Sequence, residues 1–214
     1  MKNIFLLILL FTVFGCKNKS VQKNEEKNDS NDQNSVEVSK AEPESVATFN
    51  WIDDFKEFRQ AVYTKNKTKL KTYFNFPVGD KSWGSLVSFN AEESKSRAAK
   101  YANPDLFYEE DFDQYFDRIF DADFVKSVMK IKTKDLYEEK LAQTPEFKGD
   151  DFNFTMIANY DDDDEPIFQL NLSYTNNAVD ENGEQVSEGE HNVIYIFHVI
   201  NGKKLVFKSK VFAG

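Results

Sequence analysis

The last third of the chain alternates apolar and polar residues with the period of β-strands. From Phe152 to Tyr160, and again from Phe168 to Tyr174, an apolar side chain stands at every second position. This spacing puts one row of side chains on one face of a strand, as a sheet with a single buried face requires. Asp161 to Pro166 separates the two runs, which therefore predict a hairpin.

A second hairpin follows at the end of the chain. Val193 to Ile200 is almost continuously apolar, as expected of a central strand. Asn201-Gly202 then predicts a type I′ turn, because both central positions of that turn need a positive φ. Lys203 to Phe212 returns as the last strand. The sequence thus predicts an antiparallel sheet of about four to five strands.

Helical periodicity precedes these strands. Trp51 to Thr64 carries one apolar face, at Trp51, Ile52, Phe55, Phe58, Ala61 and Val62, and predicts an amphipathic helix. Four further segments follow. They are a short helix over 68–74, a strand or ordered loop over 82–89, a polar helix over 90–101, and a helix from Glu109 to Met129 that breaks in two at 121–123. Helices followed by an antiparallel meander indicate an α+β fold over residues 50–214.

The segment between Lys17 and Phe49 cannot join this core. It is rich in Asn, Lys, Glu, Asp, Gln and Ser, and it has no aromatic residue before Phe49. Such a composition buries too little apolar area to offset the entropy lost on ordering. We expect residues 16–49 to be a flexible linker.

The start of the chain has the features of an export signal. The short basic opening Met1-Lys2-Asn3 precedes an apolar run from Ile4 to Phe14, about the length of a signal h-region. A helix of that length rises only about 16 Å, whereas a bilayer core of about 30 Å needs roughly 20 residues. The run is therefore too short for a stable membrane span.

The run ends in Val13-Phe14-Gly15-Cys16, which resembles the lipobox of bacterial lipoproteins. The resemblance implies that residues 1–15 are removed as a signal peptide, that the bond between Gly15 and Cys16 is cleaved, and that the Cys16 thiol carries acyl chains. The partner of this cysteine would be the lipid bilayer of the cell membrane or outer membrane. No acidic cluster directly follows Cys16, which favours the periplasmic side. The alternative is an ordinary signal peptide or an uncleaved anchor with an incidental cysteine.

The folded part resembles the nuclear transport factor two-like superfamily. The residues that carry the likeness are Phe55-x-x-Phe58-x-x-Ala61, Leu70, Phe74-Asn75-Phe76-Pro77, and the closing hairpin from Tyr195-Ile196-Phe197 to Asn201-Gly202. Uncharacterised lipoproteins of Bacteroidetes look similar. The resemblance implies helices packed on a curved, cone-like sheet that encloses a pocket, with residues 79–104 as an insertion.

Few residues are candidates for chemistry. His198 shares a strand face with Ile194, Ile196 and Ile200, so it is either a pocket base or a histidine with a local structural hydrogen bond. His191, beside Glu188 and Glu190, is expected to be solvated. No catalytic residue, metal site or cofactor is predicted, because no nucleophile elbow, phosphate-binding glycine loop or zinc spacing occurs.

Two acidic runs invite a calcium interpretation. Asp161 to Glu165 and Asp180 to Glu184 both lack the ligand spacing of a calcium loop, and solvated turns explain them better. The formal charge of −10 also argues against nucleic acid as a partner, since phosphate contacts need a basic surface.

Three function classes remain at this stage. The first is a membrane-anchored lipoprotein whose soluble domain binds a small molecule or an envelope protein. The second is an envelope enzyme with a pocket acid or base such as His198. The third is a structural or assembly factor of the cell envelope.

Overall fold

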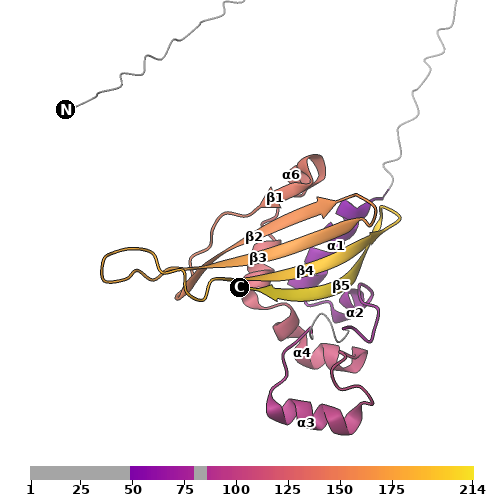
Figure 1. The fold of residues 1–214 in the computed structure, drawn as a ribbon. Helices are drawn as coiled ribbons and strands as arrows, with labels where there is room; N and C mark the ends of the chain where they lie inside the picture. Colours follow the sequence, from indigo (N-terminus) through magenta and orange to yellow (C-terminus); the bar gives the residue numbers. More distant parts are fainter. Residues whose placement is uncertain (1–48, 80–85) are drawn as a thin grey trace, which may run out of the picture. The chain divides into compact units, whose positions relative to one another are not determined.

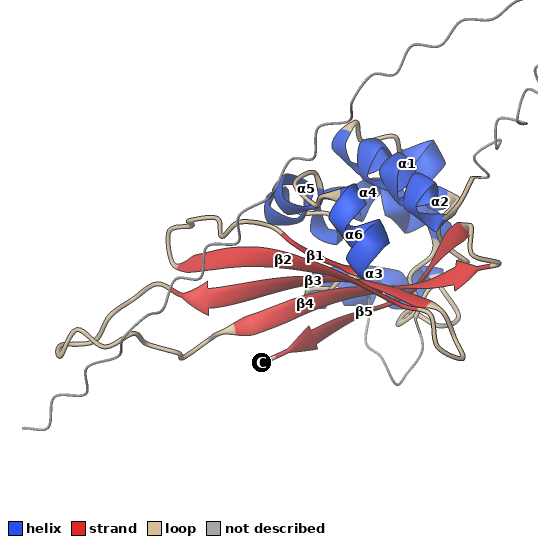
Figure 2. Ribbon diagram, turned by 90° about the horizontal axis from the view of Figure 1, so that it is seen from above, coloured by secondary structure: helices blue, strands red, loops and turns tan. Residues whose placement is uncertain are grey.

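The computed structural model describes residues 49–79 and 86–214. The expected signal peptide, Gly15, Cys16 and the linker up to residue 48 lie outside the described residues. The described chain forms an α+β domain in which helices cover one face of a five-stranded antiparallel sheet that does not close into a barrel (Figures 1 and 2).

The described helices all precede the long strands. They are α1 (Trp51–Tyr63), α2 (Lys67–Lys71), α3 (Ala91–Lys100), a 3-10 turn (Glu109–Asp111), α4 (Phe112–Ile119), α5 (Ala122–Val128) and α6 (Thr133–Glu139). The strands are β1 (Leu141–Gln143), β2 (Phe152–Asp161), β3 (Ile167–Asn176), β4 (His191–Ile200) and β5 (Lys204–Ala213). Their order in the sheet is the order of the chain.

Helix α1 begins where its cap predicts and buries its apolar face. The Asn50 side chain accepts hydrogen bonds from the backbone N–H groups of Ile52 and Asp53, and the Asp53 carboxylate accepts one from Asn50 N. This capping box satisfies donors that the first helical turn leaves unpaired. Phe55, Phe58 and Val62 are fully buried against the sheet and the other helices, so the predicted helix is confirmed.

The remaining helix predictions divide into confirmed and corrected ones. The break near 121–123 is real, because the Asp121 carboxylate caps α5 by accepting from Phe124 N at 2.8 Å. The polar helix is α3. The helix expected over 68–74 ends at Lys71, since Tyr73 and Phe74 continue in turns bonded to Leu70 O and Lys71 O. Residues 86–89 form a loop rather than a strand, and 82–85 lie outside the described residues.

Two short elements were not predicted. Helix α6 buries only Leu136, and β1 has three residues, of which only Ala142 is buried. Neither carries enough periodicity to signal its type. Strand β1 pairs with β2 from Leu141 opposite Asn159 to Gln143 opposite Ile157, and it supplies the fifth strand.

The predicted strands and hairpins are confirmed. In β4 the buried residues are Val193, Tyr195, Phe197 and Val199, which alternate with half-exposed neighbours as a sheet covered on one face requires. Asn201 and Gly202 have φ of 53° and 66°, both positive, as the type I′ turn demands.

Strand β5 departs from regular pairing at one point. Phe207 lies opposite Phe197 and Ser209 lies opposite Ile196, so Lys208 is an extra residue in a β-bulge. A bulge of this kind shifts the facing of every later residue in its strand. Lys210 therefore lies opposite Tyr195, on the face that the helices cover.

Helix α3 lies beyond the β5 side of the sheet (Figure 1) and is held by a buried ion pair. Arg97 and Asp111 are 5% and 7% exposed at their side chains, and their charged atoms lie 2.5 Å apart. The Arg97 guanidinium also donates to the carbonyl oxygens of Pro104 and Leu106 and stacks 3.9 Å above the Phe89 ring. Because the Arg97 guanidinium and the Asp111 carboxylate both have hydrogen-bond partners, the cost of burying the ion pair is offset.

A second buried carboxylate joins α1 to the sheet. Asp54 is 2% exposed and accepts hydrogen bonds from Leu205 N at 2.8 Å and from the Tyr73 hydroxyl at 3.2 Å. The Lys204 ammonium lies 3.5 Å away. One side chain thus joins the first helix, the segment after α2 and the start of β5.

We expect Asp54→Ala to lower the free energy of unfolding by about 3 kcal/mol, because it leaves the buried Leu205 N–H without an acceptor. Urea denaturation followed by circular dichroism measures this. Asp113→Ala removes an exposed carboxylate paired with Lys71 and should cost under about 1 kcal/mol. Equal losses in the two variants would contradict the assigned role of Asp54.

Candidate functional site

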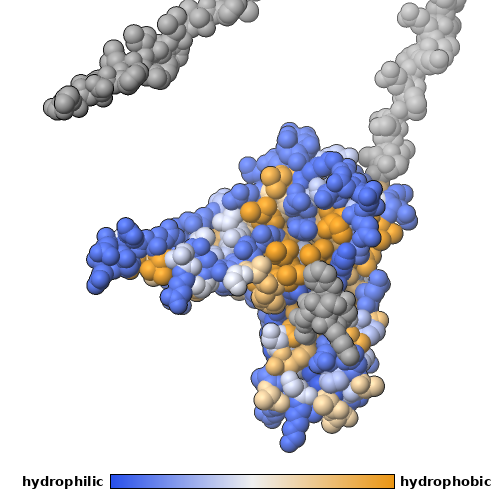
Figure 3. All heavy atoms as spheres, viewed as in Figure 1, coloured by the Kyte–Doolittle hydropathy of each residue, from blue (hydrophilic) through white to orange (hydrophobic). Residues whose placement is uncertain are grey.

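His198 lies on the face of the sheet opposite the helices. Its cross-strand neighbours on this open face are Ile167 and Val206, and Ile194 and Ile196 share the face, as the sequence predicted. Apolar side chains gather over part of this face in the space-filling view (Figure 3).

The family resemblance implies a pocket between the sheet and the helices, but the described residues fill that space. Between the sheet and the helices, Phe55, Phe168 and Phe197 are fully buried and pack ring against ring at 4.9–6.1 Å. Aromatic side chains therefore fill the described space between the two layers. His198 instead lines a hollow of about 300 Å³ at the β5 side of the sheet.

The hollow has two walls. One is the segment after α2, with Asn75, Pro77, Val78 and Gly79, together with Leu86. The other is His198 with the stretch of β5 from Val206 to Lys210. Segments far apart in the chain thus meet at one place.

Backbone pairing fixes the first wall. Val78 and Phe107 exchange two backbone hydrogen bonds of 2.8 Å each, and Phe207 N donates to Tyr73 O at 2.7 Å. Gly79 has a φ of 105°, a conformation that side chains with a Cβ rarely adopt. A side chain at this position of the wall would therefore strain the backbone.

The polar groups of the hollow are short of protein partners. Across residues 49–79 and 86–214, the half-buried side chains of His198 and Ser209 make no hydrogen bond, and neither does the exposed Asn75 amide. Polar groups that are only partly buried and have no protein partner are left to water or to a ligand. Their convergence on one hollow leaves donors and acceptors available to a ligand.

Two lysines of β5 are also among the lining residues. Lys208 is exposed at the bulge, and its ammonium lies 3.7 Å from the Glu165 carboxylate. Lys210 is only 7% exposed. Its ammonium donates to Arg118 O at 3.3 Å and lies 4.9 Å from the centre of the Tyr195 ring. Burial lowers the pKa of Lys210 to about 8, against the smaller opposing effect of the Asp121 charge.

The described lining residues include no hydrogen-bonded nucleophile–base pair. Ser209 and His198 are not hydrogen-bonded to each other, and among the described residues no carboxylate orients the imidazole. A nucleophile–base pair needs both contacts. The described lining instead combines a hydroxyl and an imidazole with the apolar side chains of Val78, Leu86 and Phe207.

The other histidine has a structural role. The His191 ring stacks on Tyr174 at 4.6 Å between centroids, with 11° between planes, and its Nδ1 lies 2.9 Å from Gly189 O. His191 is therefore half-buried, with one side of its ring packed and the residue still partly in contact with solvent.

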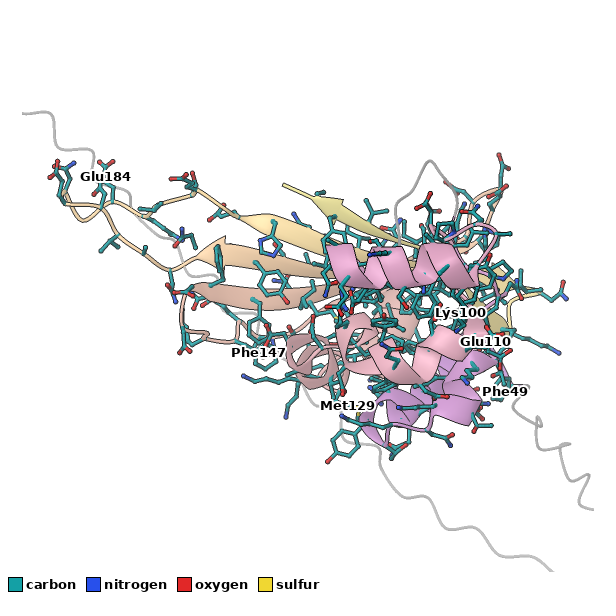
Figure 4. The ribbon with its side chains drawn as sticks, turned by 90° about the horizontal axis from the view of Figure 1, so that it is seen from below. Phe49, Lys100, Glu110, Met129, Phe147 and Glu184 are labelled. Atoms are coloured by element: carbon teal, nitrogen blue, oxygen red, sulfur yellow. The ribbon has the colours of Figure 1, made fainter. Side chains whose placement is uncertain are left out.

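The acidic runs form exposed turns. Asp161, Asp162 and Asp163 bring carboxylate oxygens within 4.8 Å of one another at the β2–β3 turn. Lys140 pairs with Asp162 at 2.6 Å, and Asp161 accepts from Asp163 N. Asp180 likewise accepts from Asn182 N and Glu184 N. Figure 4 shows Glu184 at the tip of the long β3–β4 loop, far from the helices.

Sequence reasoning missed both lysines and Ser209. The alternation in Lys203 to Phe212 carries no mark of a bulge, and without one Lys210 would share the open face with Val206. The lysine-rich strand beside His198 was the one feature of the sequence that could have indicated these residues.

No protein-family model matches the chain, and searches among curated proteins and solved structures return no match. The likeness to the nuclear transport factor two-like superfamily therefore stays a prediction. Within the described ranges, no helix combines the length and apolar character needed to cross a bilayer.

We expect Lys210→Met to stabilise the domain at pH 7. The native-state pKa of about 8 lies below the usual 10.5, so the charged amine is disfavoured by about 3 kcal/mol on folding. Loss of the bond to Arg118 O offsets about 1 kcal/mol of that gain.

The pH dependence gives a sharper test. Between pH 8 and 10.5 the unfolded state binds more protons at Lys210 than the native state does, so wild-type stability rises with pH relative to the variant. Urea titrations at pH 7 and pH 10 should show the advantage of Lys210→Met shrinking. Lys203→Met, at an exposed turn position, should show no such trend. A constant difference would refute the assigned pKa.

Proposed function

We propose that this chain is a membrane-anchored lipoprotein whose folded domain binds a ligand in the hollow between β5 and the Asn75–Gly79 segment. The observation that carries the binding role is the set of unpaired polar side chains, His198 and Ser209 foremost, that line one hollow. Ligand sites characteristically combine a concave apolar wall with a few convergent polar groups.

The anchoring role rests on the sequence. Gly15-Cys16 ends an apolar run too short for a span, and the only cysteine of the chain stands at the cleavage position. Two or more acyl chains hold a protein firmly on a bilayer, at about 0.8 kcal/mol per buried CH2. The polar residues 17–48 would then let the domain stand clear of the lipid, facing the periplasm.

The acidic charge of the chain favours attachment through a lipid tether over adhesion of the folded domain to the lipid surface. With a formal charge of −10, the protein is repelled by anionic lipid surfaces. The acylated cysteine then supplies the attachment, and the domain remains free to bind a solute or an envelope partner.

Cys16→Ser should release the protein from the membrane fraction of the producing bacterium, because a serine hydroxyl does not replace the thiol in acyl transfer. Mass spectrometry of the wild-type N-terminus should show a chain that starts at a diacylglyceryl Cys16. As a matched control, Cys16→Ser combined with Ser20→Cys restores a thiol outside the lipobox and should stay unanchored. Pelleting of Cys16→Ser with membranes would refute the anchor.

Binding at the hollow is tested with the Cys16→Ser chain and a set of small neutral, acidic and basic aromatic fragments. Fragments that bind should shift backbone amide signals of Val78 and Ser209 in NMR spectra. Ser209→Phe fills the hollow and should abolish these shifts, whereas Ser173→Phe, on the same face near the other end of β3, should not. Shifts that survive Ser209→Phe would rule out this site.

A further inference from the structure

The face of the sheet opposite the helices, called here the open face, carries no charged side chain in its middle. The alternate positions that point to this face run from Thr155 to Asn159 in β2, from Ile167 to Ser173 in β3, from Asn192 to His198 in β4 and from Ser209 to Ala213 in β5. None of these positions holds Asp, Glu, Lys or Arg, although 30% of the chain is charged. Such a depletion of charge is typical of the centre of a protein–protein interface.

Apolar side chains occupy the middle of the open face. Ile157, Asn171, Ile194 and Val211 form one row across four strands, and Ile196 stands in the next row. All five are half-buried. The described helices that pack on the sheet lie on its other face (Figure 2), and apolar atoms gather over the open face in Figure 3. An apolar surface of this kind, in contact with solvent, is typical of an interaction site.

The missing charge limits which partner fits. The chain has a formal charge of −10, so two copies repel each other where their acidic surfaces meet. The open face lets them approach without placing like charges together. A partner with a charged contact surface would instead lose the hydration of its charges and find no counter-charge on this face. The fitting partner is flat and uncharged, and the open face of a second copy has both properties.

The area of the open face is sufficient for a weak dimer. Four strands about 4.8 Å apart, over about eight residues of about 3.4 Å each, cover roughly 500 Å². Two such faces together bury about 1,000 Å², the least that a specific interface needs. Antiparallel sheets pack face to face at about 10 Å, with strand directions within about 30° of each other, so two open faces can meet over most of this area.

We propose that the open face is the interface of a homodimer, in which two copies pack sheet on sheet about a two-fold axis. This inference goes beyond the proposed function and requires no ligand in the hollow. Residues at the centre of a two-fold interface lie near the axis and meet their own counterparts. Gln169 lies at this centre, opposite Ile196 on β4, and its amide makes no hydrogen bond to another described residue. An amide both donates and accepts, so two Gln169 side chains can pair across the axis.

Sedimentation equilibrium tests the proposal on a mature chain that begins at residue 16 and carries Cys16→Ser. We expect a monomer–dimer equilibrium with a dissociation constant on the order of 10 μM. Gln169→Glu should raise this constant by about tenfold or more, because it places two carboxylates together at the centre of the interface. Gln60→Glu adds the same charge at an exposed position of α1 and should change it by less than about twofold.

A pair of opposite charges separates loss of the interface from loss of folding. Gln169→Lys alone should weaken the dimer as Gln169→Glu does, whereas an equimolar mixture of the two variants should form a dimer at least as tight as the wild type. Mixing cannot repair a folding defect. In NMR spectra of the wild type, the amide signals of Ile194 and Ile196 should shift with protein concentration, and that of Gln60 should not.

Three results would overturn the proposal. The first is a chain that stays monomeric at about 1 mM, far above the expected dissociation constant. The second is a dimer that neither Gln169 variant weakens, which would place the contact on another surface. The third is a monomer in which nuclear Overhauser contacts join Ile194 to residues 17–48, which would assign the open face to the chain's own linker.

Discussion

The domain depends on one buried carboxylate that joins its two layers. Asp54 accepts hydrogen bonds from Leu205 N and the Tyr73 hydroxyl, and Trp51 N donates to Gly202 O at 3.0 Å nearby. Together these contacts fix the start of α1 against the β4–β5 hairpin. Apolar packing of phenylalanine rings supplies most of the stabilisation but is not directional, so the hydrogen bonds to Asp54 set where the helix lies on the sheet.

The candidate site is a consequence of that placement. Tyr73, which donates to Asp54, leads directly into the Asn75–Gly79 wall, and Phe207 N donates to Tyr73 O. The hollow therefore forms between two segments held by the same contacts. Its second wall contains the bulge at Lys208, and bulges commonly redirect side chains beside functional sites. A rigid frame around unpaired polar groups keeps them available at little cost in ordering entropy on binding.

Local patterns predicted a large part of this fold. The alternation in β2 and β3, the Asn201-Gly202 turn and the break at Asp121 each depend on neighbouring residues, and each is confirmed. Elements with little local signal were missed or misjudged. Helix α6 and strand β1 bury one residue each, so they exist because neighbouring elements offer pairing and packing. The Arg97–Asp111 pair joins residues of α3 and the 3-10 turn, and the polar pattern of α3 alone could not reveal it.

The sequence by itself determined the α+β class, the strands and their hairpins, the acidic charge and the face of β4 on which His198 stands, because periods of 2 and 3.6 and turn chemistry are local properties. The tertiary structure decided the rest. Only pairing with β4 creates the bulge at Lys208, which moves Lys210 to the covered face and Ser209 to the open one. Only packing buries the Lys210 side chain against the Arg118 carbonyl, since burial and charge environment depend on residues distant in the chain.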